Sequence, residues 1–125
     1  MKSTKRLQAA RKSLGHLQLE RQRLLQIFYG NDQLIAGSYG ELFIRCGQPT
    51  CRCQQERGHF ATRLSRWVDG KLKSKIVRVA DRDWVKKASD HYKAHKLTIR
   101  NVQKLNVTEL KLLKLLLELK TTKYD

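Results

Sequence analysis

Apolar residues recur at helical spacing from about Thr4 to Tyr29, and this pattern predicts an N-terminal helix. Arg21 stands at one of the apolar positions of the repeat, so a long self-sufficient coiled coil is not expected. We expect one helix whose single apolar stripe packs against a domain or a partner, ended by the sequence Gly30-Asn31-Asp32. The apolar positions of the repeat are Leu7, Ala10, Leu14, Leu17, Leu24 and Phe28.

The middle of the chain changes to a strand pattern. Residues 37–45, GSYGELFIR, have the aromatic and β-branched content of a strand, and residues 60–79 predict a β-hairpin. Asp69-Gly70 is a type I′ turn signal, because glycine tolerates the positive φ that this turn requires. A two-residue turn pairs Val68 with Lys71, Arg66 with Lys73 and Leu64 with Lys75 on one face. The opposite face then carries Trp67, Leu72, Arg63 and Ile76.

Helical spacing returns from Asp81 to Lys120. At Asn106 the pattern allows two interpretations. Asn106 with Glu109 forms a capping box that starts a second helix, or it occupies a polar heptad position in one continuous helix. The last segment, LKLLKLLLELK, is apolar around much of its circumference. We therefore expect the N-terminal helix, a second copy of the chain or another protein to cover it.

Together these patterns predict an α+β fold. It has an N-terminal helix, a small antiparallel β-ribbon or sheet with a metal knuckle, and a long C-terminal helix or helix pair with coiled-coil character. Three segments are expected: a basic amphipathic helix over residues 1–36, a zinc-knuckle β domain over 37–80, and a leucine-rich helical region over 81–125.

The large positive charge of the chain indicates which classes of partner it is expected to bind. The chain has 27 Lys and Arg against 11 Asp and Glu, a formal net charge of +16. Such an excess attracts polyanions over a long range, and nucleic acid is the default partner, because neutralising phosphates releases counterions. No apolar run approaches the roughly 18 residues that cross a bilayer, so no membrane association is expected. The thiols favour a reducing, cytoplasmic location.

All three cysteines lie within eight residues, as Cys46-x4-Cys51-x-Cys53, and His59 follows. Cys51 and Cys53 are too close for ordinary disulfide geometry, whereas both can bind one metal ion through a turn. Thiolates and imidazole are the ligands of structural zinc, so we expect Zn²⁺ held by Cys46, Cys51, Cys53 and His59. Unligated thiols and a redox or catalytic role are the alternatives, and His91 or His95 is an alternative fourth ligand.

Basic residues crowd the same region. The residues expected to contact nucleic-acid phosphates are Arg45, Arg52 and Arg57 in the knuckle and Arg63, Arg66, Lys71, Lys73 and Lys75 in the hairpin. A solvated lysine face that merely protects an edge ribbon explains the hairpin equally well. No Ser/His/Asp order, phosphate loop or carboxylate pair is present, and Glu56 is the only acid inside the cluster. The chain alone is not expected to be an enzyme.

The segment RCGQPTCRCQQERGH, followed by the basic hairpin, resembles a family of small proteins encoded beside site-specific recombinases in mobile elements. Members share a Cys-Gly-x-Pro-x-Cys-x-Cys knuckle and a following Gly-His. The length and the basic N-terminal helix are similar to the transposition regulatory protein C type, the accessory protein of transposons that carry two tyrosine recombinases.

The resemblance implies a bacterial, nucleoid-associated accessory protein of transposition. It would bind transposon-end or target DNA and affect the efficiency and orientation of insertion, while the partner tyrosine recombinases cleave the strands. The alternative is a coiled-coil adaptor that bridges recombinase subunits, with incidental DNA contact. Under either function, the leucine-rich helices are also a candidate surface for a homo-oligomer. RNA binding ranks last, because no exposed aromatics are evident at stacking intervals.

Overall fold

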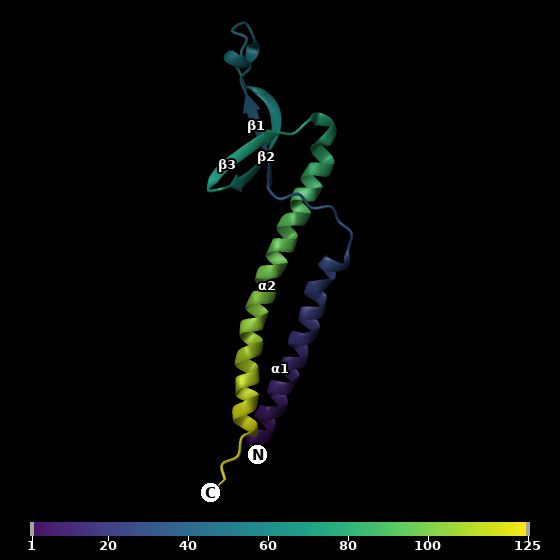
Figure 1. Ribbon diagram of the computed structural model, residues 1–125, viewed down its shortest axis with the longest axis vertical. Coiled ribbons are helices and arrows are strands. Elements are labelled where there is room, and N and C mark those ends of the chain that lie inside the picture. Colours follow the sequence, from purple (N-terminus) through teal and green to yellow (C-terminus); the bar gives the residue numbers. More distant parts are fainter. Residues whose placement is uncertain (1, 125) are drawn as a thin grey trace. The chain divides into compact units, whose positions relative to one another are not determined.

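The computed structural model describes residues 2–124, and the side chains from Thr4 onward. It confirms the α+β class. A helix, a three-stranded antiparallel sheet and a long helix follow one another along the chain (Figure 1). The elements are α1 (Lys2–Leu25), η1 (Gln26–Tyr29), β1 (Ser38–Ile44), η2 (Arg52–Gln54), β2 (His59–Val68), β3 (Lys71–Ile76), η3 (Val79–Asp81) and α2 (Arg82–Lys120).

Contacts divide the described residues into two compact units. The sheet unit spans Asp32–Ala94 and holds the sheet with the first turns of α2. The helical unit combines the chain up to Asn31 with the chain from His95 onward, so α2 contributes to both units. The three consecutive segments expected from the sequence remain a prediction about domains, and the two units are treated separately below.

The sheet has the order β1-β2-β3, and the β2–β3 register is the one predicted from the turn. Val68 faces Lys71 and Arg66 faces Lys73. Asp69 has φ 52° and Gly70 has φ 78°, the two positive values that a type I′ turn requires. This turn twists in the same sense as the strands that flank it, so local backbone chemistry favours the register of the hairpin.

One face of the sheet packs on the beginning of α2. Thr62 is fully buried, and its hydroxyl accepts a hydrogen bond from the Arg82 Nε (3.3 Å). A hollow on the same face is lined by Leu64 and Val85, among others. The residues that share the face of Leu64 by alternation, Lys75 included, therefore lie on the helix side of the sheet.

The core of the sheet unit is small and partly polar. Thr62 and Ser89 are the largest side chains of the described residues that are fully buried. Ser89, on α2, donates to the Gly37 carbonyl (2.8 Å) and accepts from the Tyr39 amide (3.2 Å), which fastens the start of β1 to the helix. Buried polar groups satisfied in this way specify an arrangement but add little hydrophobic stabilisation. A unit with so small an apolar core needs other cross-links.

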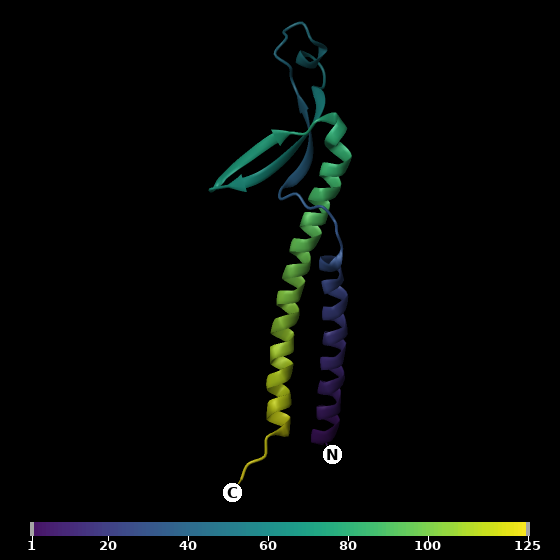
Figure 2. The same cartoon turned by 45° about the vertical axis from the view of Figure 1, so that its right-hand side comes forward.

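In the helical unit, α1 lies antiparallel to residues 95–120 of α2 (Figures 1 and 2). Arg21, the residue that interrupts the apolar repeat, forms an ion pair with Glu109 (2.7 Å). The interruption thus has a partner on the facing helix, and this paired charge specifies the register of the two helices. The helix α2 continues through Asn106, so the capping-box interpretation is wrong.

Part of the leucine-rich segment stays exposed in the helical unit. Leu105 is buried and Leu112, Leu115 and Leu116 are half-buried, whereas Leu110 and Leu117 are 58% and 69% exposed. The α1 helix therefore covers one face of this segment and leaves a second apolar face open. Within the described part of the chain, no helix combines the length and hydropathy that a membrane span requires.

Candidate metal centre

Residues 45–58 connect β1 to β2, and all three cysteines lie in this connection. It contains the short helix η2, and Cys53 is its one buried residue, at 3% exposure. His59 begins β2 and pairs with Ile44, the last residue of β1. The cysteines and the histidine therefore meet at the end of the β1–β2 ladder from which residues 45–58 extend. This connection has no apolar core of its own.

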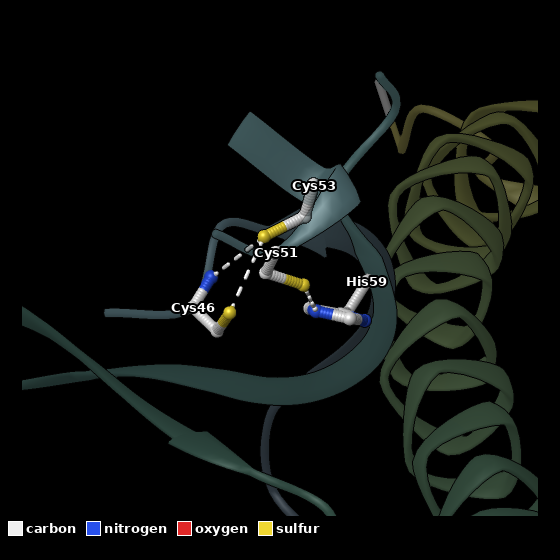
Figure 3. Close-up of side chains that lie close together, drawn as sticks. All are labelled: Cys46, Cys51, Cys53 and His59. Atoms are coloured by element: carbon white, nitrogen blue, oxygen red, sulfur yellow. Dashed lines mark hydrogen bonds between the residues drawn. The ribbon is translucent and has the colours of Figure 1, made fainter. Parts of the chain in front are cut away.

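The four side chains converge on one point (Figure 3). Their ligand atoms, three Sγ and one imidazole nitrogen, all lie within 4.8 Å of one another. The Sγ atoms of Cys46 and Cys53 are 3.4 Å apart, and the Sγ of Cys51 is 3.2 Å from the Nε2 of His59. The structure thus brings together the complete predicted set of ligands.

These distances fit a single four-coordinate ion. Ligand bonds of about 2.0–2.3 Å in a tetrahedron separate neighbouring ligand atoms by roughly 3.3–3.8 Å. The two short separations, 3.4 and 3.2 Å, are close to that range, and the 4.8 Å limit on the others requires only a small contraction. Three sulfurs and one nitrogen would fill the four positions of a tetrahedral ion.

Hydrogen bonds inside the connection hold two of the sulfurs in place. The backbone amide of Cys46 donates to the Sγ of Cys53 (3.2 Å), and the Gln54 side chain donates to the Cys46 carbonyl (2.6 Å). Arg45 donates to the Gln54 carbonyl (3.0 Å). Partners of this kind orient metal ligands and disperse the charge of a thiolate. Arg45, predicted to contact phosphate, is engaged here in closing the connection.

The thiols differ in acidity. Hydrogen bonding at the Gln48 backbone, with smaller contributions from the neighbouring thiols, lowers the pKa of the Cys46 thiol. Burial is the main cause that raises the pKa of the Cys53 thiol. The surroundings of Cys46 therefore stabilise its thiolate relative to a free cysteine, and burial destabilises that of Cys53. A bound cation removes this conflict, because it stabilises the ionised form of both sulfurs.

Gly58 brings the two ends of the connection together. A Cβ placed on Gly58 would lie 2.8 Å from the Ile44 carbonyl oxygen and 2.9 Å from its carbon. Only a residue without a side chain permits this approach of the two backbones. By contrast, a Cβ on Gly47 would meet nothing within 4 Å. Gly58 thus sets where His59 enters the ladder, and Gly47 does not need to be glycine for steric reasons.

The predicted basic residues occupy three places in the sheet unit. Arg45, Arg52 and Arg57 are in the connection, Arg63 is on the Trp67 face, and Arg66, Lys71, Lys73 and Lys75 are on the Leu64 face. All eight are exposed. The four on the Leu64 face form the largest group on a single side, and we call Arg66, Lys71, Lys73 and Lys75 the basic row.

Two arginines lie over aromatic rings close to the candidate centre. The guanidinium carbon of Arg57 is 3.7 Å from the centre of the Phe43 ring, and that of Arg82 is 4.9 Å from the centre of the Phe60 ring. The two rings are themselves 5.7 Å apart, edge to face. Cation–π contacts restrain a guanidinium without neutralising it. Arg82 was missed from the sequence, because nothing in its spacing links the start of α2 to Phe60 and Thr62.

The two histidines considered as alternative ligands lie elsewhere. The Nδ1 of His91 is 4.0 Å from a carboxylate oxygen of Asp32, and the His95 ring packs edge-on against Phe28 at 5.0 Å. Among the residues that the structure describes, the set of Cys46, Cys51, Cys53 and His59 is the one group of ligand atoms close enough to hold a metal ion.

A family model described as "Domain of unknown function (DUF6788)" matches residues 5–87. The match includes most of α1, the whole sheet and the candidate metal centre, and it covers more than half of the chain. Comparisons with curated proteins and with solved structures found no match.

Proposed function

The chain belongs to the DUF6788 family, and we propose that it is a nonenzymatic DNA-binding protein stabilised by a structural zinc ion. The observation that carries the proposal is the course of β2. This strand begins with a ligand, His59, and continues into the ribbon that bears Arg66 opposite Lys73. A metal that fixes His59 also fixes the strand that presents the basic row, so metal binding and anion binding share one element.

Zinc is the metal that the ligand set fits best. Soft thiolates select zinc, copper(I) or iron–sulfur clusters, and a closed set of three cysteines and one histidine is a common structural zinc site. The residues that hold it are Cys46, Cys51, Cys53 and His59. The ion supplies a cross-link among residues that have almost no apolar core. The absence of an open coordination position supports a structural rather than a catalytic role.

DNA is the partner that the charge favours. The β2–β3 ribbon, residues 59–76, carries five basic residues and one acid, Asp69, within a chain of net charge +16. The proposal places the basic row along a phosphate backbone, with Arg52, Arg57 and Arg82 as a second group near the centre. Contacts of this kind position the protein on DNA without reading its sequence.

The biological setting follows from the resemblance of the knuckle and hairpin to accessory proteins of the transposition regulatory protein C type. On this basis the protein assists tyrosine recombinases of the same element in the efficiency and orientation of insertion. Strand cleavage then belongs to the recombinases, and this chain contributes DNA contacts and a docking surface in a bacterial cytoplasm.

A salt titration of duplex DNA binding tests the proposal. If the four residues of the basic row each neutralise one phosphate, log Kobs falls with log salt concentration at a slope of about −3.6. Transposon-end DNA and unrelated DNA of equal length, each with and without the recombinases, separate targeting from general affinity. Absence of duplex binding by the zinc-loaded protein at low salt would contradict the proposed function.

A second candidate function, an adaptor between recombinase subunits, is favoured by the exposed Leu110 and Leu117 of the helical unit. Full-length protein with both leucines changed to glutamine distinguishes the two. Under both functions, these changes leave duplex affinity unaltered. Under the DNA-binding function, transposition efficiency also stays unaltered, whereas under the adaptor function association with the recombinases and transposition are both lost.

A further inference from the structure

Three large apolar side chains are exposed on one face of the β2–β3 ribbon. Trp67 is 72% exposed, and Leu72 and Ile76 are each 54% exposed. Trp67 lies directly opposite Leu72, and Ile76 lies opposite Arg63. Exposed apolar groups that gather on one face, rather than being scattered singly, indicate a binding surface.

This face is open to solvent. Between the Trp67–Leu72 pair and the Arg63–Ile76 pair lies a third pair, Ser65 and Ser74, whose hydroxyls are hydrogen-bonded at 2.8 Å. By strand alternation, the Trp67 face is opposite the face on which Thr62 and Leu64 meet the start of α2. Within the sheet unit, the tip of the ribbon extends away from the first turns of α2 (Figure 2). No described part of this unit covers Trp67.

The positive charge around these side chains favours an anionic partner. Arg63 lies on the Trp67 face itself, and the basic row lines the other side of the same two-stranded ribbon. Asp69 is the only acidic residue of the ribbon, which is fully described. A surface that combines a large aromatic ring with a strong positive field matches a ligand that has both flat bases and phosphates.

We propose that the Trp67 face is a stacking platform for unpaired bases of a DNA strand, a specificity that rests on the proposed function. Bases in a duplex are stacked on one another about 3.4 Å apart and show only their edges in the grooves. An indole ring therefore gains a stacking partner only where a base is unstacked. Arg63, on the same face, contacts a phosphate of the stacked strand, the basic row on the opposite face adds to the positive field, and Trp67 distinguishes unpaired from paired DNA.

Fluorescence of Trp67 tests this directly, because the chain has two tryptophans. In the full-length, zinc-loaded W84F variant, Trp67 is the only indole, and the substitution keeps an aromatic ring at the other tryptophan position. The probes are a single-stranded oligothymidine and a duplex with the same number of phosphates. Stacking predicts that the oligothymidine quenches the Trp67 emission at saturation and that the duplex leaves it nearly unchanged.

Substitutions in the full-length protein supply the energetic test. Base–aromatic stacking predicts that W67A binds the oligothymidine roughly 5- to 140-fold more weakly, with duplex affinity within about twofold of the unmodified protein. W67F, which keeps a ring, should recover most of the loss. Y29A is the matched control, since Tyr29 is 79% exposed but lies outside the ribbon, and it should change neither affinity. Because Trp67 is exposed, these variants should keep the native circular dichroism.

Several results would overturn the platform. They are unchanged affinity of W67A for the oligothymidine, an equal loss for both DNAs, or equal quenching by both. A fall in the molar mass of the free protein on W67A substitution would instead assign the face to contacts between copies. The proposed function fails by a different result, namely that the unmodified protein binds neither probe at low salt.

Discussion

The two connections of the sheet both reverse the direction of the chain, but they differ in length and in the interactions that hold them. Asp69 and Gly70 reverse the chain between β2 and β3, whereas residues 45–58 do so between β1 and β2. The short turn depends only on two positive φ angles of its own backbone. The long connection contains one buried residue, Cys53, and converges on four ligand atoms.

This difference shows where each connection obtains its stability. A short type I′ turn costs little entropy to close and needs no tertiary contacts. A long connection without an apolar core leaves a large conformational entropy to be offset by a few groups. The proposed zinc ion would offset it in one step, because binding energy at a site that exists only in the folded state is folding energy. The turn thus depends on local interactions, whereas the order of residues 45–58 is expected to depend on the metal.

Removing the metal should have the largest effect, because it should disorder the long connection and leave the short turn intact. C53S removes a buried ligand, and we expect the protein to lose bound zinc and the order of residues 45–58. Structural zinc binding is worth of the order of 10 kcal/mol in small metal domains, so the free energy of opening this connection should fall to near zero. Hydrogen exchange measures it: amides of residues 45–58 exchange at once, while those around the Asp69-Gly70 turn keep their protection.

The control for this experiment is T50S, which alters the same connection without touching a ligand, and it should retain both metal and protection. Full protection of residues 45–58 in metal-free C53S would show that the connection is stable by itself. Loss of protection at both connections would show that the turn is not independent of the metal.

Substitution of the connection's close-packed glycine comes next in size. G58A places a methyl group 2.8 Å from the Ile44 carbonyl oxygen, so one backbone segment must move. We expect a loss of about 1–3 kcal/mol in the free energy of unfolding, measured by urea denaturation of the zinc-loaded protein. G47A is the matched control, because its methyl group meets nothing within 4 Å, and it should change stability by less than about 0.5 kcal/mol. Equal losses for the two variants would refute the steric role of Gly58.

A substitution in the short turn should cost less and act differently. In G70A a residue with a Cβ must adopt φ 78°, which costs about 1–2 kcal/mol although no atom lies within 4 Å of the new methyl group. The loss should be the same with and without zinc. D69N, which places the Asn-Gly pair preferred by type I′ turns there, should be neutral or slightly stabilising. A zinc-dependent effect of G70A would contradict the independence of this turn.

The smallest effect concerns charge at the ribbon rather than stability. K73Q removes one member of the basic row on an exposed strand position. Duplex affinity should fall a few-fold and the salt slope should decrease in magnitude by about one, with no change in unfolding free energy. K123Q, at an exposed position after α2, is the charge-matched control and should leave the slope unchanged. A slope that K73Q does not alter would remove Lys73 from the phosphate contacts.

The same contrast explains what the sequence predicts well. The β2–β3 register follows from Asp69-Gly70, and the ligand set follows from cysteine spacing, because both are local patterns. The apolar stripe of α1 could be predicted from its heptad repeat. The partner of Arg21 could not, since Glu109 lies far along the chain. The packing of Arg82 on Phe60 and the hydrogen bonds of Ser89 likewise depend on tertiary contacts that no spacing encodes.

Which face of the sheet packs against α2 could not be predicted from the sequence either. Alternation placed Leu64 with the basic row and Trp67 with Leu72 and Ile76, but gave no sign of which face the helix covers. The Trp67 face has larger and more apolar side chains than the Leu64 face, so it would be expected to be the buried one. The structure instead uses the Leu64 face, where Thr62 supplies a hydrogen bond to Arg82, and leaves Trp67 exposed.

X-ray absorption spectroscopy of the purified, zinc-loaded protein tests the proposed zinc site. We expect one zinc ion per chain, with three sulfur ligands at about 2.3 Å and one nitrogen ligand at about 2.0–2.1 Å. The H59C variant should change the shell to four sulfurs. A shell made of oxygen and nitrogen ligands, fewer than three sulfurs, or an H59C spectrum identical to that of the unmodified protein would contradict the proposed site.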